Sequence, residues 1–193
     1  MSSGTKFTAR VRESAEKFVA HEITLEDMHR YLDLFEQLDL EIWIDGGWGV
    51  DALLGEQSRP HEDLDFLIEK ADSDRLVTAI RQLGFEDVHT NDHSAWNFVM
   101  GTASGKNFDF HVIEQLSDGN YRYGSTDDPI HVTAESIDAT GTIGGRSVRC
   151  PTAAFQINSH SGYTLKQQDI DDVTALSEKF GIPLLPDQLA FCE

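Results

Sequence analysis

The segment that most constrains this chain is residues 63–68, an apolar, strand-like stretch that carries two aspartates one residue apart. Side chains of a strand alternate between its two faces, so Asp63 and Asp65 are expected on the same face. Two carboxylates held side by side repel each other unless a cation lies between them. Because Mg²⁺ takes a few protein carboxylates together with the phosphates of a substrate, the segment predicts a metal site for a phosphorylated compound.

A glycine pair, Gly46 and Gly47, follows the short apolar stretch 42–44. Glycine has no Cβ, so its backbone can approach a phosphate group closely. The order of these motifs predicts a strand, a glycine turn, a short helix over residues 48–54, and then the strand with the two aspartates. Together they indicate metal-dependent chemistry on a nucleoside triphosphate.

A third carboxylate, Asp109, lies in the apolar segment Phe108–Val112. Alternation directs the two phenylalanines of this segment to the core, and Asp109 and His111 to the opposite face. An acidic residue in such a strand is costly unless it is exposed or bound to a ligand. If the strand lies beside the first one, Asp109 joins Asp63 and Asp65 in a cluster suited to one or two Mg²⁺. Because Asp-x-Asp alone is common on solvated surfaces, the argument rests on the order and spacing of all three motifs.

The net charge of −19 over 193 residues narrows the range of partners. A strongly acidic surface disfavours nucleic acid, because binding phosphates needs basic residues, and it steers small cationic substrates toward the protein. Solubility, or adaptation to high salt, explains the same charge equally well. No apolar stretch approaches the length of a membrane span, and the N-terminus lacks the apolar stretch of a signal peptide. We therefore expect a cytoplasmic protein with no membrane partner.

The apolar periodicity predicts an α+β fold, a mixed sheet flanked by helices. Thr24 and Asp27 form a capping-box pattern at the start of a helix that ends near Asp39. Residues 117–138 are polar and aperiodic, and we expect them to form an irregular substrate loop. The remaining elements are helices over 72–83, 152–160 and 165–180, strands over 64–68, 85–89, 96–100 and 107–113, and a hairpin across 142–148.

The chain length fits one domain with short appendages. Residues 1–20 have weak patterning and mixed charge, and we expect an N-terminal extension there, partly helical or disordered. The domain, with its C-terminal helices, is expected over residues 21–181. Gly181 and Pro183 stop the last helix, so residues 182–193 are expected to form a tail.

The chain resembles the antibiotic nucleotidyltransferases of the polymerase-beta-like superfamily. It is similar above all to the small lincosamide nucleotidyltransferases, and next to the aminoglycoside 2″-nucleotidyltransferases. The resemblance extends from about residue 25 to residue 180, and the segments that carry it are Trp43–Asp51, Arg59–Asp65, Phe108–His111 and His160–Tyr163. It implies the polymerase-beta-like nucleotidyltransferase fold and the transfer of AMP from ATP to a hydroxyl of a small molecule. That acceptor would be a cationic lincosamide or aminoglycoside, and pyrophosphate would be released.

The resemblance also implies a metal centre and a general base. Asp63 and Asp65 would bind Mg²⁺, and Asp109 would complete a site for two ions. Asp109 would also take the proton of the acceptor hydroxyl, so that all three carboxylates are candidate catalytic residues.

The nucleotide would lie against the glycine turn and the last helix. Relatives usually carry a Lys-Asp-x-x-Asp pattern on that helix, and here Gln168 occupies the lysine position, so we expect Lys166 to substitute for it. The nucleotide-binding residues implied by the resemblance are Gly46, Gly47, Arg59, His61, Lys166 and Asp169.

Candidate acceptor-binding residues are His111, Tyr121 and Tyr123, the two tyrosines on position alone. Trp48 is expected in the core rather than as a platform for stacking the base. Asp45 and Asp51 are expected to cap or brace the glycine turn instead of touching a ligand. Further alternatives stay open at Tyr163, which either contacts the base or simply packs.

Two other functions fit the same motifs. The first is a nucleotidyltransferase of the toxin–antitoxin type that acts on a protein or an RNA end, although the acidic charge argues against RNA. The second is a non-catalytic relative that binds nucleotide without transfer, against which the intact set of three carboxylates argues. Relatives of this kind often pair, so a homodimer is also left open.

Overall fold

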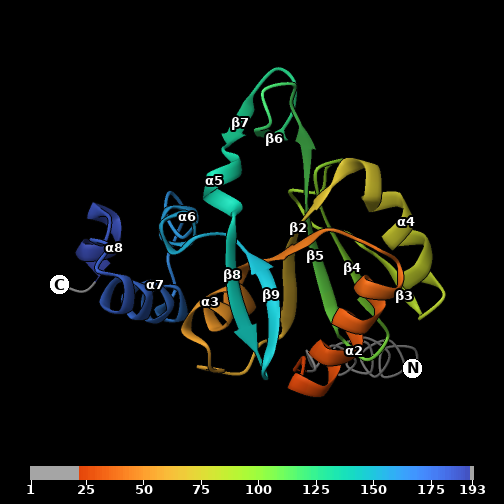
Figure 1. Ribbon diagram of the computed structural model, residues 1–193, viewed down its shortest axis with the longest axis horizontal. Helices are drawn as coiled ribbons and strands as arrows, with labels where there is room; N and C mark the ends of the chain where they lie inside the picture. The colour runs from red at the N-terminus through yellow and green to blue at the C-terminus, as the bar shows by residue number, and fades with distance from the viewer. Residues whose placement is uncertain (1–21, 192–193) are drawn as a thin grey trace, which may run out of the picture.

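The computed structural model describes residues 22–191, and the extension expected over residues 1–20 lies outside them. A seven-stranded mixed sheet forms the centre of the molecule (Figure 1). β2 and β5 are its parallel pair, and the other paired strands are antiparallel. Five of its strands form a continuous path in the order β1 (Ile42–Ile44), β2 (Asp63–Glu69), β5 (Asn107–Gln115), β4 (Asn97–Thr102) and β3 (Phe85–Val88), and the other two branch from β5.

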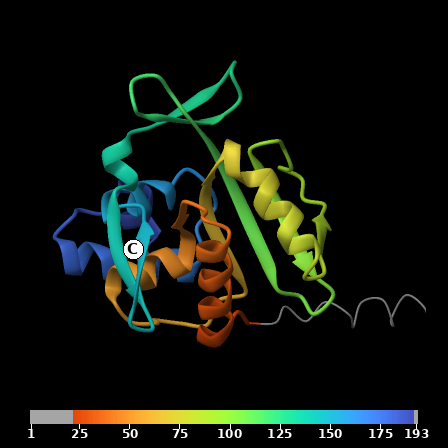
Figure 2. The same ribbon diagram turned by 45° about the vertical axis from the view of Figure 1, so that its right-hand side comes forward.

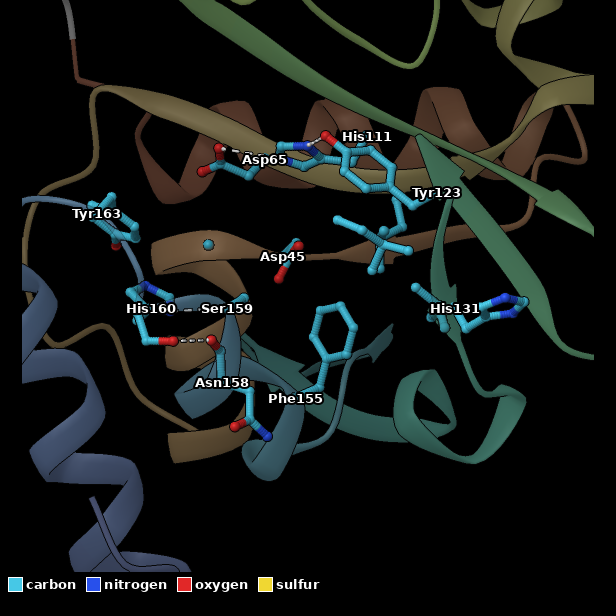
Figure 3. Close-up of a pocket in the computed structure, with 15 residues that line it drawn as sticks. Asp45, Asp65, His111, Tyr123, His131, Phe155, Asn158, Ser159, His160 and Tyr163 are labelled. Atoms are coloured by element: carbon cyan, nitrogen blue, oxygen red, sulfur yellow. Dashed lines mark hydrogen bonds and ion pairs between the residues drawn. The ribbon is translucent and has the colours of Figure 1, made fainter. Parts of the chain in front are cut away.

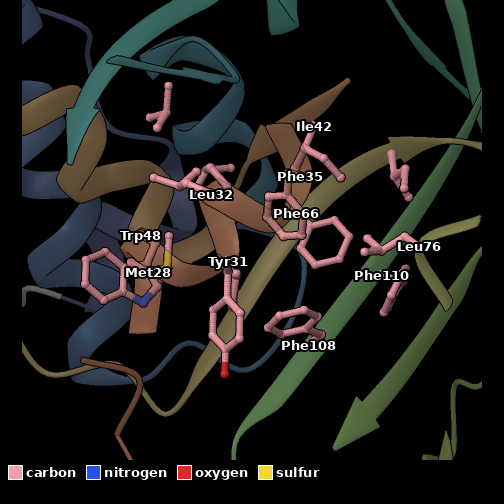
Figure 4. Close-up of a cluster of buried hydrophobic side chains, with 14 of the residues drawn as sticks. Met28, Tyr31, Leu32, Phe35, Ile42, Trp48, Phe66, Leu76, Phe108 and Phe110 are labelled. Carbon is pink, nitrogen blue, oxygen red and sulfur yellow. The ribbon is translucent and has the colours of Figure 1, made fainter. Parts of the chain in front are cut away.

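One face of this sheet packs against α2 (Leu25–Gln37) and α4 (Lys70–Arg81) through a core rich in aromatic rings (Figure 4). Phe66 of β2 packs edge-on against Phe110 of β5, with the ring centroids 4.7 Å apart. These side chains alternate with the residues on the opposite face, as period-2 strands require. The result is one apolar face and one face free to carry polar groups.

The capping box at the start of α2 is present as the sequence predicts. Thr24 Oγ1 accepts a hydrogen bond from the backbone N–H of Asp27, and Asp27 Oδ2 accepts one from the backbone N–H of Thr24. The two bonds satisfy backbone donors that would otherwise lack partners at the helix start. The remaining elements are α3 (Gly46–Leu54), α5 (Ala134–Ile137), the hairpin β8 (Ala139–Ile143) and β9 (Arg146–Cys150), α6 (Ala153–Ser159) and α7 (Gln167–Phe180).

The expectation of an irregular loop over residues 117–138 is wrong. The segment forms β6 (Tyr121–Gly124), β7 (Pro129–Val132) and α5, and β6 extends the sheet by pairing with the end of β5. The hairpin of β6 and β7 projects beyond the rest of the sheet in both views (Figures 1 and 2). Its short strands lack a full alternating pattern, and they are held by the pairing of β6 with β5 and by the packing of Tyr121 and Val132 in a core cluster.

Two element boundaries also differ from expectation. α3 begins at Gly46, so the glycine pair forms the first turn of a helix instead of a separate loop. The C-terminal segment expected as a tail contains α8 (Pro186–Phe191), whose Gln188 side chain donates hydrogen bonds to the carbonyls of Ile157 and His160. The α+β class, with a mixed sheet flanked by helices, is confirmed. None of the helices within residues 22–191 is both long and apolar enough to cross a membrane.

Candidate active site

Asp65 and Asp109 lie directly opposite each other on the parallel strands β2 and β5. The carboxylate cluster expected from the sequence depends on this pairing as a condition, and the structure meets that condition. Asp63 lies on the same face one pair earlier, opposite Asn107. Leu67 and His111 form the next pair on this face, so the carboxylates and the imidazole follow one another along the two strands.

The ligand atoms of Asp65, Asp109 and His111 all lie within 4.8 Å of one another, a spacing that fits one metal ion. Oδ1 of Asp109 is buried and has no hydrogen-bond partner among the described residues. Burial and the neighbouring carboxylates raise the pKa of Asp65 well above its ordinary value. Burial also raises the pKa of Asp109, although His111 partly offsets the shift. Unpaired carboxylates at this distance repel each other, and a divalent cation between them removes the repulsion.

The N-terminus of α3 lies beside these carboxylates. The backbone N–H of Asp45 donates to the carbonyl of Asp65, which ties the start of α3 to β2. Asp45 is the N-cap residue, yet its side chain makes no capping hydrogen bond to the helix. The first amides of α3 therefore keep their N–H groups available, and such groups bind anions at helix N-termini.

A cavity of about 520 Å³ opens in front of the carboxylates (Figure 3). Asp45, Asp65 and His111 lie at its base, and two kinds of wall rise from it. The apolar wall consists of Leu67, Tyr123, Ile130, Val132 and Phe155. The polar wall consists of Asn158, Ser159, His160, Ser161 and Tyr163. A cavity of this size holds a small molecule, and its divided lining suits a ligand with one apolar and one polar part.

Asp45 differs from its expected role. Its side chain projects into the cavity between Asp65 and Phe155 instead of bracing the glycine turn (Figure 3). The residue is 8% exposed, and its Oδ1 is buried without a hydrogen-bond partner in the described part of the chain. An unpaired buried carboxylate is costly, so this group is available for a cationic ligand.

Residues 27–176 match the aminoglycoside-2″-adenylyltransferase family. The chain belongs to this family. A lincosamide resistance protein from Staphylococcus haemolyticus is 26% identical over 161 residues, which cover 80% of this chain and 94% of that protein. A 2″-aminoglycoside nucleotidyltransferase from Escherichia coli is 33% identical over 57 residues, which cover 30% of this chain and 32% of that protein.

Solved structures agree with this assignment. The crystal structure of a lincosamide antibiotic adenylyltransferase with bound lincomycin is similar at a TM-score of 0.72 and 25% identity, covering 81% of this chain and 98% of that one. An aminoglycoside 2″-nucleotidyltransferase in complex with adenylyl-2″-tobramycin has a TM-score of 0.62 at 20% identity, covering 81% and 89%, and shows the shared fold. The predicted resemblance is confirmed, and the chain is a nucleotidyltransferase of the antibiotic-modifying kind.

Arg59 and His61 of this adenylyltransferase are held behind the first turn of α3. Arg59 donates two hydrogen bonds to Asp172 of α7, with Nη2 2.7 Å from Oδ2. His61 Nε2 lies 2.5 Å from Oδ2 of Asp51, and both residues are 2% exposed. A Cβ on Gly47 would lie 2.7 Å from Arg59 Nη2, so the second glycine makes room for these side chains. Neither Arg59 nor His61 lines the cavity.

Lys166 and Asp169 lie at the start of α7. The backbone N–H of Lys166 donates to Oδ2 of Asp169 at 2.7 Å, so this aspartate caps the helix. The Lys166 side chain is exposed, and neither residue lines the cavity. Tyr163, a few residues before them, does line it.

The three candidates for acceptor binding are divided between cavity and core. His111 and Tyr123 line the cavity, with His111 Nδ1 3.4 Å from the Tyr123 hydroxyl. Tyr121 lies on the same face of β6 but two residues further from the cavity, where it packs edge-on against Trp43. It is 7% exposed and belongs to the core, because its ring packs against Trp43. Trp48 is buried in the core, as expected.

Sequence reasoning missed the walls of the cavity. Ile130, His131 and Val132 lie on β7, inside the segment interpreted as irregular. Phe155 and Asn158 lie on α6, whose short sequence has no motif. The only signal for this region was the His160–Tyr163 segment that carries part of the family resemblance, since it directly follows α6.

Proposed function

We propose that this protein is a Mg²⁺-dependent adenylyltransferase that moves AMP from ATP to a hydroxyl of a lincosamide, or failing that of an aminoglycoside, and releases pyrophosphate. The observation that carries the proposal is the carboxylate of Asp65, which lines a 520 Å³ cavity beside an uncapped helix N-terminus and is paired on the sheet with Asp109 directly behind that lining. The adenylyltransferase family match and the lincosamide-modifying relatives support the same reaction.

The metal would be held by the carboxylates on β2 and β5. Asp65 and Asp109 would share Mg²⁺. Asp63 is exposed and lies outside this group of ligand atoms, but it is one pair earlier on the same face, where it would bind a second ion. Bound ions would neutralise the triphosphate and the developing charge of the leaving pyrophosphate. The raised pKa of Asp65, caused by burial and neighbouring carboxylates, is what a site built for a cation is expected to have.

Asp109 would act as the general base. The acceptor oxygen would attack the α-phosphorus, the bond to the pyrophosphate would break, and the hydroxyl proton would pass to an oxygen of Asp109. Its buried Oδ1 has no hydrogen-bond partner among the described residues. Burial raises the pKa of Asp109, which brings its basicity closer to neutral pH than that of a solvated aspartate.

The triphosphate would lie at the N-terminus of α3. The free amides of Gly46 and Gly47 would donate to phosphate oxygens, and the positive end of the helix would favour the negative charge. Arg59 and His61, held directly behind this turn by Asp172 and Asp51, would support the phosphate site from behind. Lys166 and Asp169 stay predictions for the nucleotide site, with Tyr163 the nearest cavity-lining neighbour.

The acceptor would be a cationic molecule with an apolar part. Asp45 offers a buried, unpaired carboxylate to an ammonium group, and the net charge of −19 steers cations toward the protein. The apolar wall around Phe155 and Val132 suits the alkyl groups of a lincosamide better than a fully polar aminoglycoside. His111 and Tyr123, which lie across the cavity from Phe155, would contact the acceptor or the ion (Figure 3).

The test is transfer from ¹⁴C-labelled ATP to a panel of lincosamides and aminoglycosides, read by mass spectrometry. We expect a Mg²⁺-dependent product heavier by one AMP with a lincosamide. Asp109→Asn should abolish it while circular dichroism and thermal melting show an intact fold. Retained turnover in Asp109→Asn would refute the assignment of the base. AMP on a copurifying protein, with no antibiotic product, would instead support the toxin–antitoxin type, and ATP binding without any transfer would support the non-catalytic relative.

The oligomeric state is a separate proposal. Sedimentation equilibrium of the full chain would show whether it forms the homodimer that relatives of this kind suggest.

A further inference from the structure

A chain of polar contacts extends from the carboxylate cluster to the surface of the protein. His111 Nδ1 lies 3.4 Å from the Tyr123 hydroxyl, and that hydroxyl lies 2.9 Å from Oδ1 of Asn97. Nδ2 of Asn97 lies 2.9 Å from Oδ2 of Asp92. The chain therefore connects β5, β6, β4 and the turn before β4, and its inner end faces Asp65 (Figure 3).

The direction of every hydrogen bond in this chain follows from its outer end. The carboxylate of Asp92 accepts hydrogen bonds and donates none, so Asn97 turns its amide N–H to Asp92 and its carbonyl to Tyr123. The Tyr123 hydroxyl must then donate to Asn97. Its lone pairs are left facing His111.

The Tyr123 hydroxyl determines which nitrogen of the His111 imidazole carries the proton. Because the tyrosine oxygen offers only lone pairs, Nδ1 of His111 carries the N–H. A neutral imidazole has one N–H, so Nε2 keeps a free lone pair. Nε2 lies 4.0 Å from Oδ1 of Asp65, which is too long for a hydrogen bond. The lone pair thus points at the Asp65 carboxyl group with no hydrogen bond between them, and a cation placed between the two groups would bind both.

We propose that Nε2 of His111 is a nitrogen ligand of the divalent cation held by Asp65 and Asp109, and that the chain Tyr123–Asn97–Asp92 fixes the tautomer that makes it one. Metal-binding histidines commonly donate their other N–H to a group that sets the ring orientation, as Tyr123 does here. The proposal rests on the proposed function and adds a ligand that the carboxylate motifs do not contain.

A nitrogen ligand changes which metal the site prefers. Mg²⁺ favours oxygen ligands, whereas first-row transition metals also accept a nitrogen ligand, with an affinity that rises from Mn²⁺ to Co²⁺. The site should bind Mn²⁺ more tightly than Mg²⁺, and replacing His111 by glutamine should remove most of that preference. We expect the Kd for Mn²⁺ to rise by about tenfold or more in His111→Gln, while the Kd for Mg²⁺ changes much less.

Pulsed EPR of the full chain loaded with Mn²⁺ tests the ligand directly, because electron spin-echo modulation detects a ¹⁴N nucleus bound to the ion. ATP is left out, since its adenine also contains nitrogen. We expect a directly bound ¹⁴N signal in the wild-type protein and its loss in His111→Gln. His131→Gln is the matched control, because His131 also lines the cavity but is outside the cluster, and it should keep the signal.

The outcomes separate this proposal from the proposed function. A wild-type protein that adenylylates its acceptor but shows no ¹⁴N coupling, or a signal that persists in His111→Gln, would overturn the nitrogen ligand and leave the function standing. Failure of Mn²⁺ to bind both alone and in the presence of ATP would overturn both. Tyr123→Phe should keep the ¹⁴N signal but raise the Kd for Mn²⁺ by about tenfold, because the ring loses the partner that orients it.

Discussion

Gly46 packs so closely against Asp65 that a Cβ on the glycine would lie 2.7 Å from Cγ of the aspartate. Gly46 also has a φ of 54°, in the left-handed region that a side chain disfavours. The glycine thus brings the free amides of α3 and the metal-site carboxylate of β2 next to each other. This close approach joins the proposed triphosphate site to the proposed metal site.

Gly46→Ala should therefore damage the site more than the fold. The new methyl group would displace the Asp65 carboxylate, and a displacement of about 1 Å at a reacting centre costs on the order of 100-fold in rate. Calorimetry should show weakened Mn²⁺ binding together with the loss of AMP transfer. Gly55→Ala is the matched control, because Gly55 also has a positive φ, 81°, but a Cβ there would meet no atom within 4 Å. Equal losses in both variants would contradict the role given to Gly46.

Asp65→Asn should stabilise the metal-free protein while abolishing transfer. Burial and neighbouring carboxylates raise the folded-state pKa of Asp65, so the folded protein holds this proton more tightly than the unfolded chain does. The destabilisation by Asp65 therefore appears as pH rises through the raised pKa and is absent at pH values below the ordinary aspartate pKa of about 3.9. Asparagine removes it, and each 1 kcal/mol gained raises Tm by about 2–4 °C in a chain of this size.

Calorimetric melts at pH 7 and at acidic pH, with and without Mg²⁺, check that expectation. The Tm of Asp65→Asn should exceed that of the wild type by less at acidic pH. In saturating Mg²⁺ the wild type should melt higher than the variant, because only the wild type has the carboxylate that binds the ion. Asp74→Asn, at an exposed position of α4, should change Tm little under every condition. A metal-free Asp65→Asn variant that melts below the wild type at pH 7 would rule out repulsion in the cluster.

Asp45→Asn should weaken binding of a cationic acceptor but not of ATP. A hydrogen bond between charged groups contributes about 1.5–3 kcal/mol, so the KM for an amine-bearing lincosamide should rise by about 10–100-fold. The KM for Mg²⁺-ATP is the internal control. An acceptor analogue with an amide in place of the amine should lose affinity for the wild type, yet be used equally by both proteins. An equal rise of both KM values would indicate that Asp45 acts through the metal.

The ion pair of Arg59 with Asp172 should contribute chiefly to stability. Asp172 is 3% exposed, and its loss of a partner leaves a buried charge uncompensated. Arg59→Met should destabilise the fold by about 2–4 kcal/mol in urea unfolding, less than a fully buried pair because Arg59 is partly exposed. Asp172→Leu combined with Arg59→Met should recover part of the loss. A double-mutant cycle without coupling, and a large rise in the KM for ATP, would instead favour a direct phosphate contact.

Much of the site could be predicted because it lies on regular strands. Strand alternation places Asp63 and Asp65 on one face whatever surrounds them, and it separates Asp109 from the two buried phenylalanines beside it. The pairing of β2 with β5 needed only the assumption that two apolar strands with carboxylates on the same face lie side by side. These features are local or periodic, so the sequence expresses them directly.

The residues that line the cavity walls, and the distant side chains that contact the candidate site residues, could not be predicted in this way. β6 and β7 are short strands. β6 pairs with β5 and β7 pairs with β6, so these strands depend on tertiary pairing that their own sequence does not predict. Arg59 lies near the glycine turn in sequence, but its partner Asp172 is 113 residues away. Tyr121 and Tyr123 have the same pattern, and only the packing against Trp43 sends one of them into the core.

The sequence by itself determined the α+β class, the order of the motifs, the family and the carboxylates that define the candidate site, because each depends on local propensity, period-2 alternation or a short motif. Only the tertiary structure decided that Asp45 faces the cavity unpaired, that His111 presents Nε2 to Asp65, and that Arg59 is held by Asp172. These arrangements depend on contacts between segments far apart in the chain, and no local pattern encodes which distant side chain will satisfy or leave unsatisfied a buried polar group.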